Sequence, residues 1–393
     1  MTKLAFVNAK VYSPLYLPNA VVLVDDNKIE KVVFTNEYNE KIKPTNQYLE
    51  INLDGLNLSP GFIDLQVNGC GGANFNETLE NLSFETLNTM HSCNVKHGVT
   101  TFLPTLITSP IEFRRKALEV ITDFQQANPD LVASVPGIHI EGPHISIEKK
   151  GTHNPAYIKP MQQVDLDLYL EYKDIIKMLT LAPEENDLAL VKQLLDAGIL
   201  VSIGHTNATY EKAKEFINAG VKSATHLFNA MTSITNGRTP GVIGAIYESP
   251  EISPGLIVDG VHVNWPLVNL SLKVKKDRIF IVTDAVTPAG TDVTEFKFAN
   301  KIIKVINQGC YDEFGCLSGS AITMDSQLSR LKENSDLSTE EILSLVTYNP
   351  AKHIGMEKQI GTLYPEAFAN LAVFDDEFNI KATYVNGKEV YHQ

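Results

Sequence analysis

Short apolar runs alternate with amphipathic stretches through the middle of the chain, between about residues 60 and 350. This alternation is typical of βα units, in which helices connect the strands of a parallel sheet. The runs occupy residues 61–67, 99–107, 134–142, 175–183, 200–206, 223–231, 255–263 and 278–286. Eight strands with helices between them predict an α/β fold of the (β/α)8 TIM-like type, whose active site lies at the carboxyl ends of the strands.

Two helix starts are legible outside the apolar runs. Ser109 and Glu112 have the spacing of a capping box, with Pro110 at the first helical position, and Ser338 and Glu341 form a second box. In a capping box the first and last residues exchange hydrogen bonds between side chain and backbone amide. Both segments are therefore predicted to begin helices.

The two ends of the chain have a different pattern. Residues 4–34 predict antiparallel strands around the turn at residues 25–27, and residues 371–391 predict strands joined at Asn386-Gly387, a strong hairpin dipeptide. We expect one small β-sandwich domain built from both termini, with the barrel inserted between them. The predicted boundaries are residues 1–58 and 355–393 for the small domain and 59–354 for the barrel.

Composition narrows the classes of partner. The chain has 393 residues and a formal net charge of -14, which argues against nonspecific binding to nucleic acid or to anionic membranes. No apolar run approaches the ~20 residues of a membrane span, and the first residues lack a secretory signal, so a cytoplasmic location is expected. The four cysteines form no close pair, which favours free thiols over a disulfide framework.

Ionisable side chains gather near the ends of four runs. Glu141 lies at the end of the third run, His205 of the fifth and Asp284 of the eighth, while His226 lies within the sixth. Buried strands rarely carry such groups unless they are paired or functional. A single histidine of this kind is more often a hydrogen-bonded structural residue, but four such residues at one rim favour a divalent-metal site with an open position for water.

The first run ends with two amides, Gln66 and Asn68, which share one face of the predicted strand. Amides are poor metal ligands, so their place at the predicted rim needs an explanation. They could donate and accept hydrogen bonds that order the mouth of the site and its water. Alternatively, they could satisfy backbone groups of the following loop.

Several strings of the sequence, taken together, resemble one family. They are PGFIDLQVNGCGG, HIEGPH, KKGTHNP, GHTNAT, THLFNAM, DGVHV, VTDA and LSGS. From about residue 58 to residue 375 the chain resembles the amidohydrolase superfamily and, within it, the N-acetylglucosamine-6-phosphate deacetylases. The superfamily's usual first-strand motif is His-x-His, which binds a second metal, and Gln66 and Asn68 stand in its place here. The resemblance therefore implies one divalent metal per subunit, most commonly zinc, with iron, manganese or cobalt possible, held by Glu141, His205 and His226.

The resemblance also implies the roles of other residues in amide hydrolysis. Asp284 would take a proton from a metal-activated water and deliver it to the leaving nitrogen, while His153 would help to polarise the acetyl carbonyl. Arg238 and His262 would contact the phosphate of the phosphosugar substrate, and a homodimer is expected because a neighbouring subunit can supply such a contact in related enzymes. Further substrate contacts would come from Thr152, Asn229, Ala230, Leu317, Ser318, Gly319 and Ser320.

Two other functions remain open from the sequence. One is a different amidohydrolase, such as a cyclic-amide hydrolase or a nucleobase aminohydrolase, although these usually keep the His-x-His motif. The other is a noncatalytic barrel scaffold, which retention of the four rim residues argues against. Metal content would separate an enzyme from a scaffold.

Overall fold

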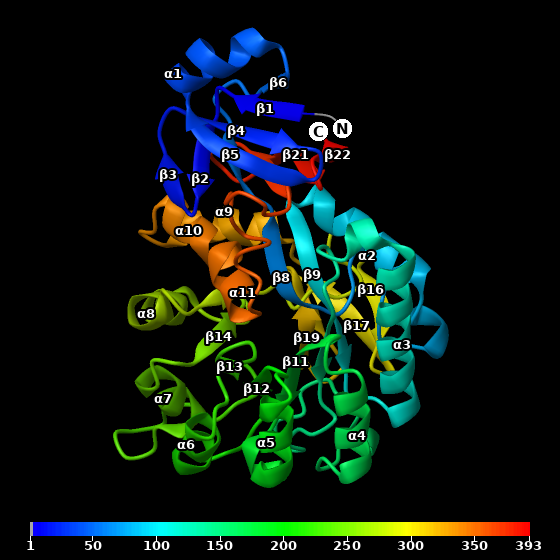
Figure 1. Ribbon diagram of the computed structural model, residues 1–393. Coiled ribbons are helices and arrows are strands. Elements are labelled where there is room, and N and C mark those ends of the chain that lie inside the picture. The colour runs from blue at the N-terminus through cyan, green and yellow to red at the C-terminus, as the bar shows by residue number, and fades with distance from the viewer. Residues whose placement is uncertain (1–2) are drawn as a thin grey trace. The chain divides into compact units, whose positions relative to one another are not determined.

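A computed structural model describes residues 3–393 of the protein (Figure 1). By internal packing the chain divides into two compact units. The first comprises Met1–Asp64, His91–Phe102 and Thr323–Gln393, and the second comprises Leu65–Met90 and Leu103–Ile322. The domain boundaries predicted from the sequence stay a prediction.

The eight predicted strands all form, in one sheet whose spatial order follows the sequence. They are β8 (Phe62–Val67), β9 (Val99–Ile107), β10 (Ile138–Glu141), β11 (Ile176–Leu181), β12 (Val201–Ile203), β13 (Ser223–Ala224), β14 (Ser253–Leu256) and β15 (Phe280–Ile281). The neighbours from β9 to β15 pair in parallel. A parallel bridge between Val67 and Ala285 links the end of β8 to the segment after β15. The predicted barrel is confirmed.

A helix follows each of the first seven barrel strands, as the βα pattern predicts (Figure 1). These helices are α2 (Phe84–Lys96), α3 (Ile111–Ala127), α4 (Gln163–Glu171), α5 (Leu188–Asp196), α6 (Tyr210–Asn218), α7 (Gly241–Glu248) and α8 (Trp265–Lys275). Helices α9 (Met324–Asn334), α10 (Thr339–Val346) and α11 (Tyr348–His353) come later. Within residues 3–393 no helix is both long and apolar enough to cross a membrane.

The two predicted capping boxes have different outcomes. Helix α10 begins with the predicted box, in which Ser338 Oγ accepts from the Glu341 amide at 3.3 Å and Glu341 Oε2 accepts from the Ser338 amide at 2.9 Å. The box at Ser109 is wrong. Pro110 itself occupies the N-cap of α3 without a side-chain cap, which leaves Ser109 one residue too early to reach the first helical amides.

An antiparallel sheet that the sequence reading missed is inserted between β15 and α9. Its strands are β16 (Glu295–Phe298), β17 (Lys301–Ile306), β18 (Gly309–Tyr311) and β19 (Leu317–Ser320). Phe296, Phe298, Ile303 and Cys310 form its small core. The LSGS segment forms the strand β19, which pairs with β18.

The first unit contains two sheets built from both ends of the chain, as predicted. One has the order β5-β4-β1-β6 and the other β22-β21-β20-β7-β2-β3. Their bounds are β1 (Lys3–Val7), β2 (Lys10–Ser13), β3 (Leu15–Leu17), β4 (Ala20–Asp25), β5 (Lys28–Phe34), β6 (Leu49–Asn52), β7 (Asn57–Pro60), β20 (Leu371–Phe374), β21 (Ile380–Val385) and β22 (Lys388–His392). Side chains from both sheets, among them Phe6, Val22, Leu371 and Tyr384, share one apolar core. The β5–β6 connection carries a short helical segment that begins with α1 (Thr35–Glu37).

Candidate active site

Three potential metal ligands converge at the carboxyl ends of barrel strands. His226 Nε2 lies 3.0 Å from Glu141 Oε1 and 3.0 Å from His205 Nε2, and His205 Nε2 lies 3.2 Å from the same carboxylate oxygen. All three side chains are buried. These separations are close to the roughly 3.3 Å between ligands of a tetrahedral site whose metal bonds are about 2.0–2.1 Å long. The donor set therefore fits a divalent cation.

The backbone at His205, His226 and Asp284 has a conformation that costs free energy. His205, His226 and Asp284 have φ values of 46°, 30° and 49°, in the left-handed region that residues with a Cβ rarely adopt. Each follows the end of a short barrel strand, where the chain turns away from the sheet. Outliers of this kind cluster at functional sites, where the surrounding structure imposes them.

His205 and Glu141 are each in the state that binds a metal. His205 Nδ1 donates to the Lys149 carbonyl at 2.8 Å, so its proton lies on Nδ1 and its Nε2 presents a lone pair. Burial opposes ionisation of Glu141, but His205 and His226 outweigh it and hold its pKa well below the ordinary value. Glu141 is therefore an anionic ligand.

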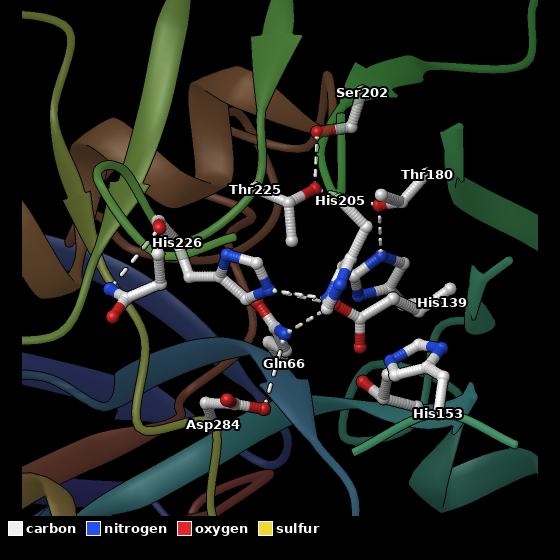
Figure 2. Close-up of polar contacts among 12 residues, drawn as sticks. Gln66, His139, His153, Thr180, Ser202, His205, Thr225, His226 and Asp284 are labelled. Carbon is white, nitrogen blue, oxygen red and sulfur yellow. Dashed lines mark hydrogen bonds and ion pairs between the residues drawn. The ribbon is translucent and has the colours of Figure 1, made fainter. Parts of the chain in front are cut away.

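Two amides at the end of β8 connect the ligands to Asp284. Gln66 Nε2 donates to Glu141 Oε1 and to Asp284 Oδ1, both at 3.1 Å (Figure 2). Asn68 Nδ2 donates to Asp284 Oδ1 at 2.7 Å. N–H donors thus stand where two carboxylates would otherwise repel each other. Of the two readings left open by the sequence, the geometry supports the one in which the pair orders the site.

Asp284 is a buried carboxylate with a shifted titration. Burial, followed by repulsion from Glu141, raises its pKa to about 6. A carboxyl group with a pKa near neutrality can both accept and return a proton. Its backbone is fixed as well, because the Asp284 carbonyl accepts from the Ser320 amide at 2.9 Å. A Cβ at Gly319 would lie 2.9 Å from that carbonyl oxygen, so the close approach of β19 requires a glycine there.

His153 lies beside His205, with ring centroids 4.3 Å apart. Its Nδ1 is 2.8 Å from Thr108 Oγ1 and accepts, at 3.4 Å, from the Thr108 amide, which can only donate. Burial and then His205 lower the pKa of His153 well below its ordinary value, so the ring is neutral. A neutral ring that accepts at Nδ1 carries its proton on Nε2.

A pocket of about 560 Å³ encloses these groups. Thirteen of the predicted site residues line it, which is most of the predicted set: Asn68, Glu141, Thr152, His153, His205, His226, Asn229, Ala230, His262, Asp284, Leu317, Ser318 and Gly319. His262 Nδ1 lies 2.7 Å from Asp259 Oδ2, so Asp259 orients the ring. The sequence therefore predicts most of the wall of one pocket.

Comparisons with known proteins agree with this arrangement. Residues 57–390 match the amidohydrolase family model. The chain belongs to the amidohydrolase family. It is 38% identical to the N-acetylglucosamine-6-phosphate deacetylase of Haemophilus influenzae, over 98% of this chain and 99% of the relative. It is 34% identical to an N-acetylgalactosamine-6-phosphate deacetylase of a Shewanella species, over 85% and 83% respectively. Among solved structures, N-acetylglucosamine-6-phosphate deacetylase from Pasteurella multocida matches with a TM-score of 0.93 and 38% identity over the whole of both chains. The family resemblance read from the sequence is confirmed.

Three predicted residues of this amidohydrolase do not line its pocket. Gln66 lies behind the wall and acts through its bonds to Glu141 and Asp284. Ser320 is buried, and its hydroxyl donates to the Thr283 carbonyl at 2.6 Å. Arg238 is exposed in the loop before α7 and does not line the pocket, and its phosphate contact stays a prediction.

Sequence reasoning missed several lining residues of the amidohydrolase. Four of them, Glu148 to Gly151, adjoin the predicted Thr152 and His153, and this adjacency is the signal that could have identified them. The others are Ile107, Ile147, Phe298 and Cys316. Phe298 belongs to the sheet that the sequence reading missed, so its place could not be expected.

A chain of buried polar groups also lies within the barrel (Figure 2). His139 Nε2 is 2.7 Å from Thr180 Oγ1, which is 2.7 Å from Thr225 Oγ1, which in turn is 2.7 Å from Ser202 Oγ. Burial lowers the pKa of His139 to about 4, so this ring is neutral. These hydrogen bonds pair buried polar side chains of β10, β11 and β12 with Thr225, which directly follows β13, and so link neighbouring barrel strands.

Proposed function

We propose that the protein hydrolyses N-acetylglucosamine 6-phosphate to glucosamine 6-phosphate and acetate. The observation that carries the proposal is the convergence, in one pocket, of three metal-ligand atoms with Asp284 and a neutral His153. Amide hydrolysis needs an activated water, a proton for the leaving nitrogen and a donor to the carbonyl oxygen, and this set can supply all three. The 38% identity to a deacetylase of this specificity over nearly the whole chain supports the choice of substrate.

Glu141, His205 and His226 would hold one divalent metal, for which we propose zinc. Such an ion, when bound, lowers the pKa of water and polarises a carbonyl. Gln66 and Asn68 occupy the positions from which a second ion would be bound in relatives with His-x-His. Their N–H groups are directed at Glu141 and Asp284, which favours a single ion.

Asp284 would carry the proton in both steps. As a carboxylate it accepts the proton of the attacking water, and as the resulting acid it donates this proton to the departing amine nitrogen. Hydrogen bonds from Gln66 and Asn68 to the same oxygen, Oδ1, leave Oδ2 as the atom for this exchange.

His153 would donate from Nε2 to the acetyl carbonyl oxygen. Thr108 supports this role because its amide must donate to Nδ1, which places the ring proton on the opposite nitrogen. A positioned neutral donor stabilises the negative charge that develops on this oxygen during attack.

The phosphate would be held by His262 and, from a second copy of the chain, by Arg238. His262 Nδ1 lies 2.7 Å from Asp259 Oδ2, which leaves Nε2 as the ring nitrogen for the phosphate. Arg238 does not line the pocket of its own chain, and its exposed side chain is available to a second copy in a homodimer. Backbone groups of Asn229 and Ala230 would assist at the phosphate, and Thr152 and residues 317–320 at the sugar.

The test is acetate release from N-acetylglucosamine 6-phosphate, from the unphosphorylated sugar and from N-acetylgalactosamine 6-phosphate. We expect the first to give the highest kcat/KM. A lack of preference for the phosphate would refute the phosphosugar reading, and a preference for the galactosamine epimer would move the substrate to that sugar. Arg238→Ala should reduce kcat/KM for the phosphosugar by roughly ten- to a hundredfold and leave the unphosphorylated sugar unaffected. An equal loss on both would make Arg238 structural.

A further inference from the structure

A second cavity, of about 230 Å³, lies at the start of helix α3. Its walls are formed by Ser109 to Ile111 and Arg114 on one side and by residues 156–159 on the other. It shares no lining residue with the pocket of the candidate active site. None of the residues that line it takes part in the proposed reaction.

Two hydrogen-bond donors in these walls lack a protein partner among residues 3–393. They are Ser109 Oγ and Arg114 Nε, on side chains that are 6% and 0% exposed. The other guanidinium nitrogens of Arg114 are used, since Nη1 donates to Tyr169 Oη at 2.5 Å and Nη2 to Asp165 at 2.7 Å. Buried donors are nearly always satisfied, so an acceptor in the cavity would complete both.

The charged residues that line the cavity are both cations, Arg114 and Lys159, and Asp165 behind them pairs with both. The exposed Glu112 of the first turn of α3 lies outside the lining. His144, whose Nδ1 lies 3.1 Å from the Lys159 carbonyl, adds no charge, because burial and then Arg114 lower its pKa to about 3. The cavity also adjoins the N-terminus of a 17-residue helix whose first turn has no side-chain cap. Free amide groups and the helix dipole favour an anion at such an end.

We propose that this cavity binds a small phosphate-class oxyanion, either inorganic phosphate or the phosphoryl group of a small phosphomonoester. Its oxygens would accept from Ser109 Oγ and Arg114 Nε, face the first turn of α3, and lie near the ammonium group of Lys159. A ligand with only acceptors and a negative charge matches a cavity with unpartnered donors and excess positive charge.

The position of the cavity connects it with the catalytic pocket. Ser109 directly follows Thr108, which binds His153 Nδ1. On the opposite wall, Asn154, the residue after His153, caps the turn Pro155–Tyr157 by accepting from the Ala156 amide at 3.0 Å. An anion would therefore tie together the two segments that hold His153.

The test uses the full-length protein. Crystals soaked in selenate, whose selenium scatters anomalously, should show a peak between Ser109 and Lys159. Calorimetry with inorganic phosphate and with glycerol 3-phosphate distinguishes the free ion from the phosphoryl group, since only the free ion should bind if the cavity admits no ester. A crystal that shows water alone in the cavity at saturating selenate would overturn the proposal.

Variants separate this cavity from any phosphate bound in the active site. Ser109→Ala and Lys159→Met each remove one contact and retain Arg114, and each should weaken binding at the cavity about tenfold. Lys116→Met is the matched control, because it removes the same charge from an exposed position of α3 outside the cavity. Equal anomalous peaks in all three variants at a selenate concentration below saturation would also overturn the proposal.

Discussion

Replacing Asn68 by alanine should move the acidic limb of the pH–rate profile to higher pH. In the proposed mechanism Asp284 acts first as a base, so activity should fall as the pH decreases through its pKa, which burial and then Glu141 raise to about 6. The Asn68 amide stabilises the carboxylate form through the 2.7 Å bond to Oδ1. Without that bond, protonation of Asp284 becomes easier and its pKa rises further.

The size of this shift follows from the bond. A hydrogen bond to a charged group contributes about 1.5–3 kcal/mol, and one pKa unit corresponds to about 1.4 kcal/mol. The loss of Asn68 should therefore raise the pKa by roughly one to two units. Gln66 still donates to the same oxygen at 3.1 Å, which favours the lower end of this range.

The assay is kcat/KM for the phosphosugar as a function of pH. Asn186→Ala is a suitable control, because Asn186 is also a buried amide but donates to the carbonyls of His144 and Ala182. The control should lower stability without moving the acidic limb. An unchanged limb in Asn68→Ala, with metal content equal to that of the wild type, would show that Asp284 is not the group whose ionisation controls the rate.

Three further changes test other parts of the structure. Asp284→Asn should lower kcat by ~10²–10⁴-fold without loss of metal; near-normal turnover would exclude its role as proton carrier. His226→Gln should lower metal occupancy and activity together, from about one ion per chain, and elemental analysis that gives two tightly bound ions in the wild type would contradict the single-metal site. Burial lowers the pKa of His97, but Asp325 and Cys93 outweigh it and raise the pKa to about 9. The stabilisation from this raised pKa is complete below about pH 6.5 and lost as the pH rises through about 9. Asp325→Asn should therefore lower Tm, relative to the wild type, by more at pH 6 than at pH 10. Equal differences in Tm at the two pH values would contradict this reasoning.

The barrel could be predicted because its strands are short, mostly apolar runs that alternate with amphipathic stretches. Parallel strands covered on both sides are continuous hydrophobic runs, and Val99–Ile107 is buried at every position. The inserted sheet was missed although β16 alternates exposed and buried residues, because its four residues are few and the glycine and serines of β19 have low β-propensity. A period-two pattern is present in β16 but not in β17, where apolar residues stand next to each other.

The metal ligands were predictable because ionisable residues are conspicuous in runs that read as buried strands. The residues that orient the other side chains of the site were not, because their contacts depend on the folded structure. Thr108 fixes the tautomer of His153 from 45 positions away. Asp259 orients His262 from only three positions away, and the string DGVH carries that signal, but the bond depends on a turn that the sequence does not reveal. Arg238 does not line the pocket of this chain, and the phosphate contact proposed for it would involve a second copy of the chain, which one sequence does not describe.

The sheet shared by both ends of the chain has a consequence for biosynthesis. Strand β7 pairs with β2 on one side and with β20 on the other, and the Asn57 side chain donates to the Phe374 carbonyl across 317 positions. At about 5–20 residues per second a ribosome needs roughly 15–60 s to make that stretch. During this time the edge of β7 that later receives β20 has no native partner. The nascent chain therefore presents an open strand edge to chaperones for tens of seconds, and the completion of this sheet must wait for nearly the last strands to be made.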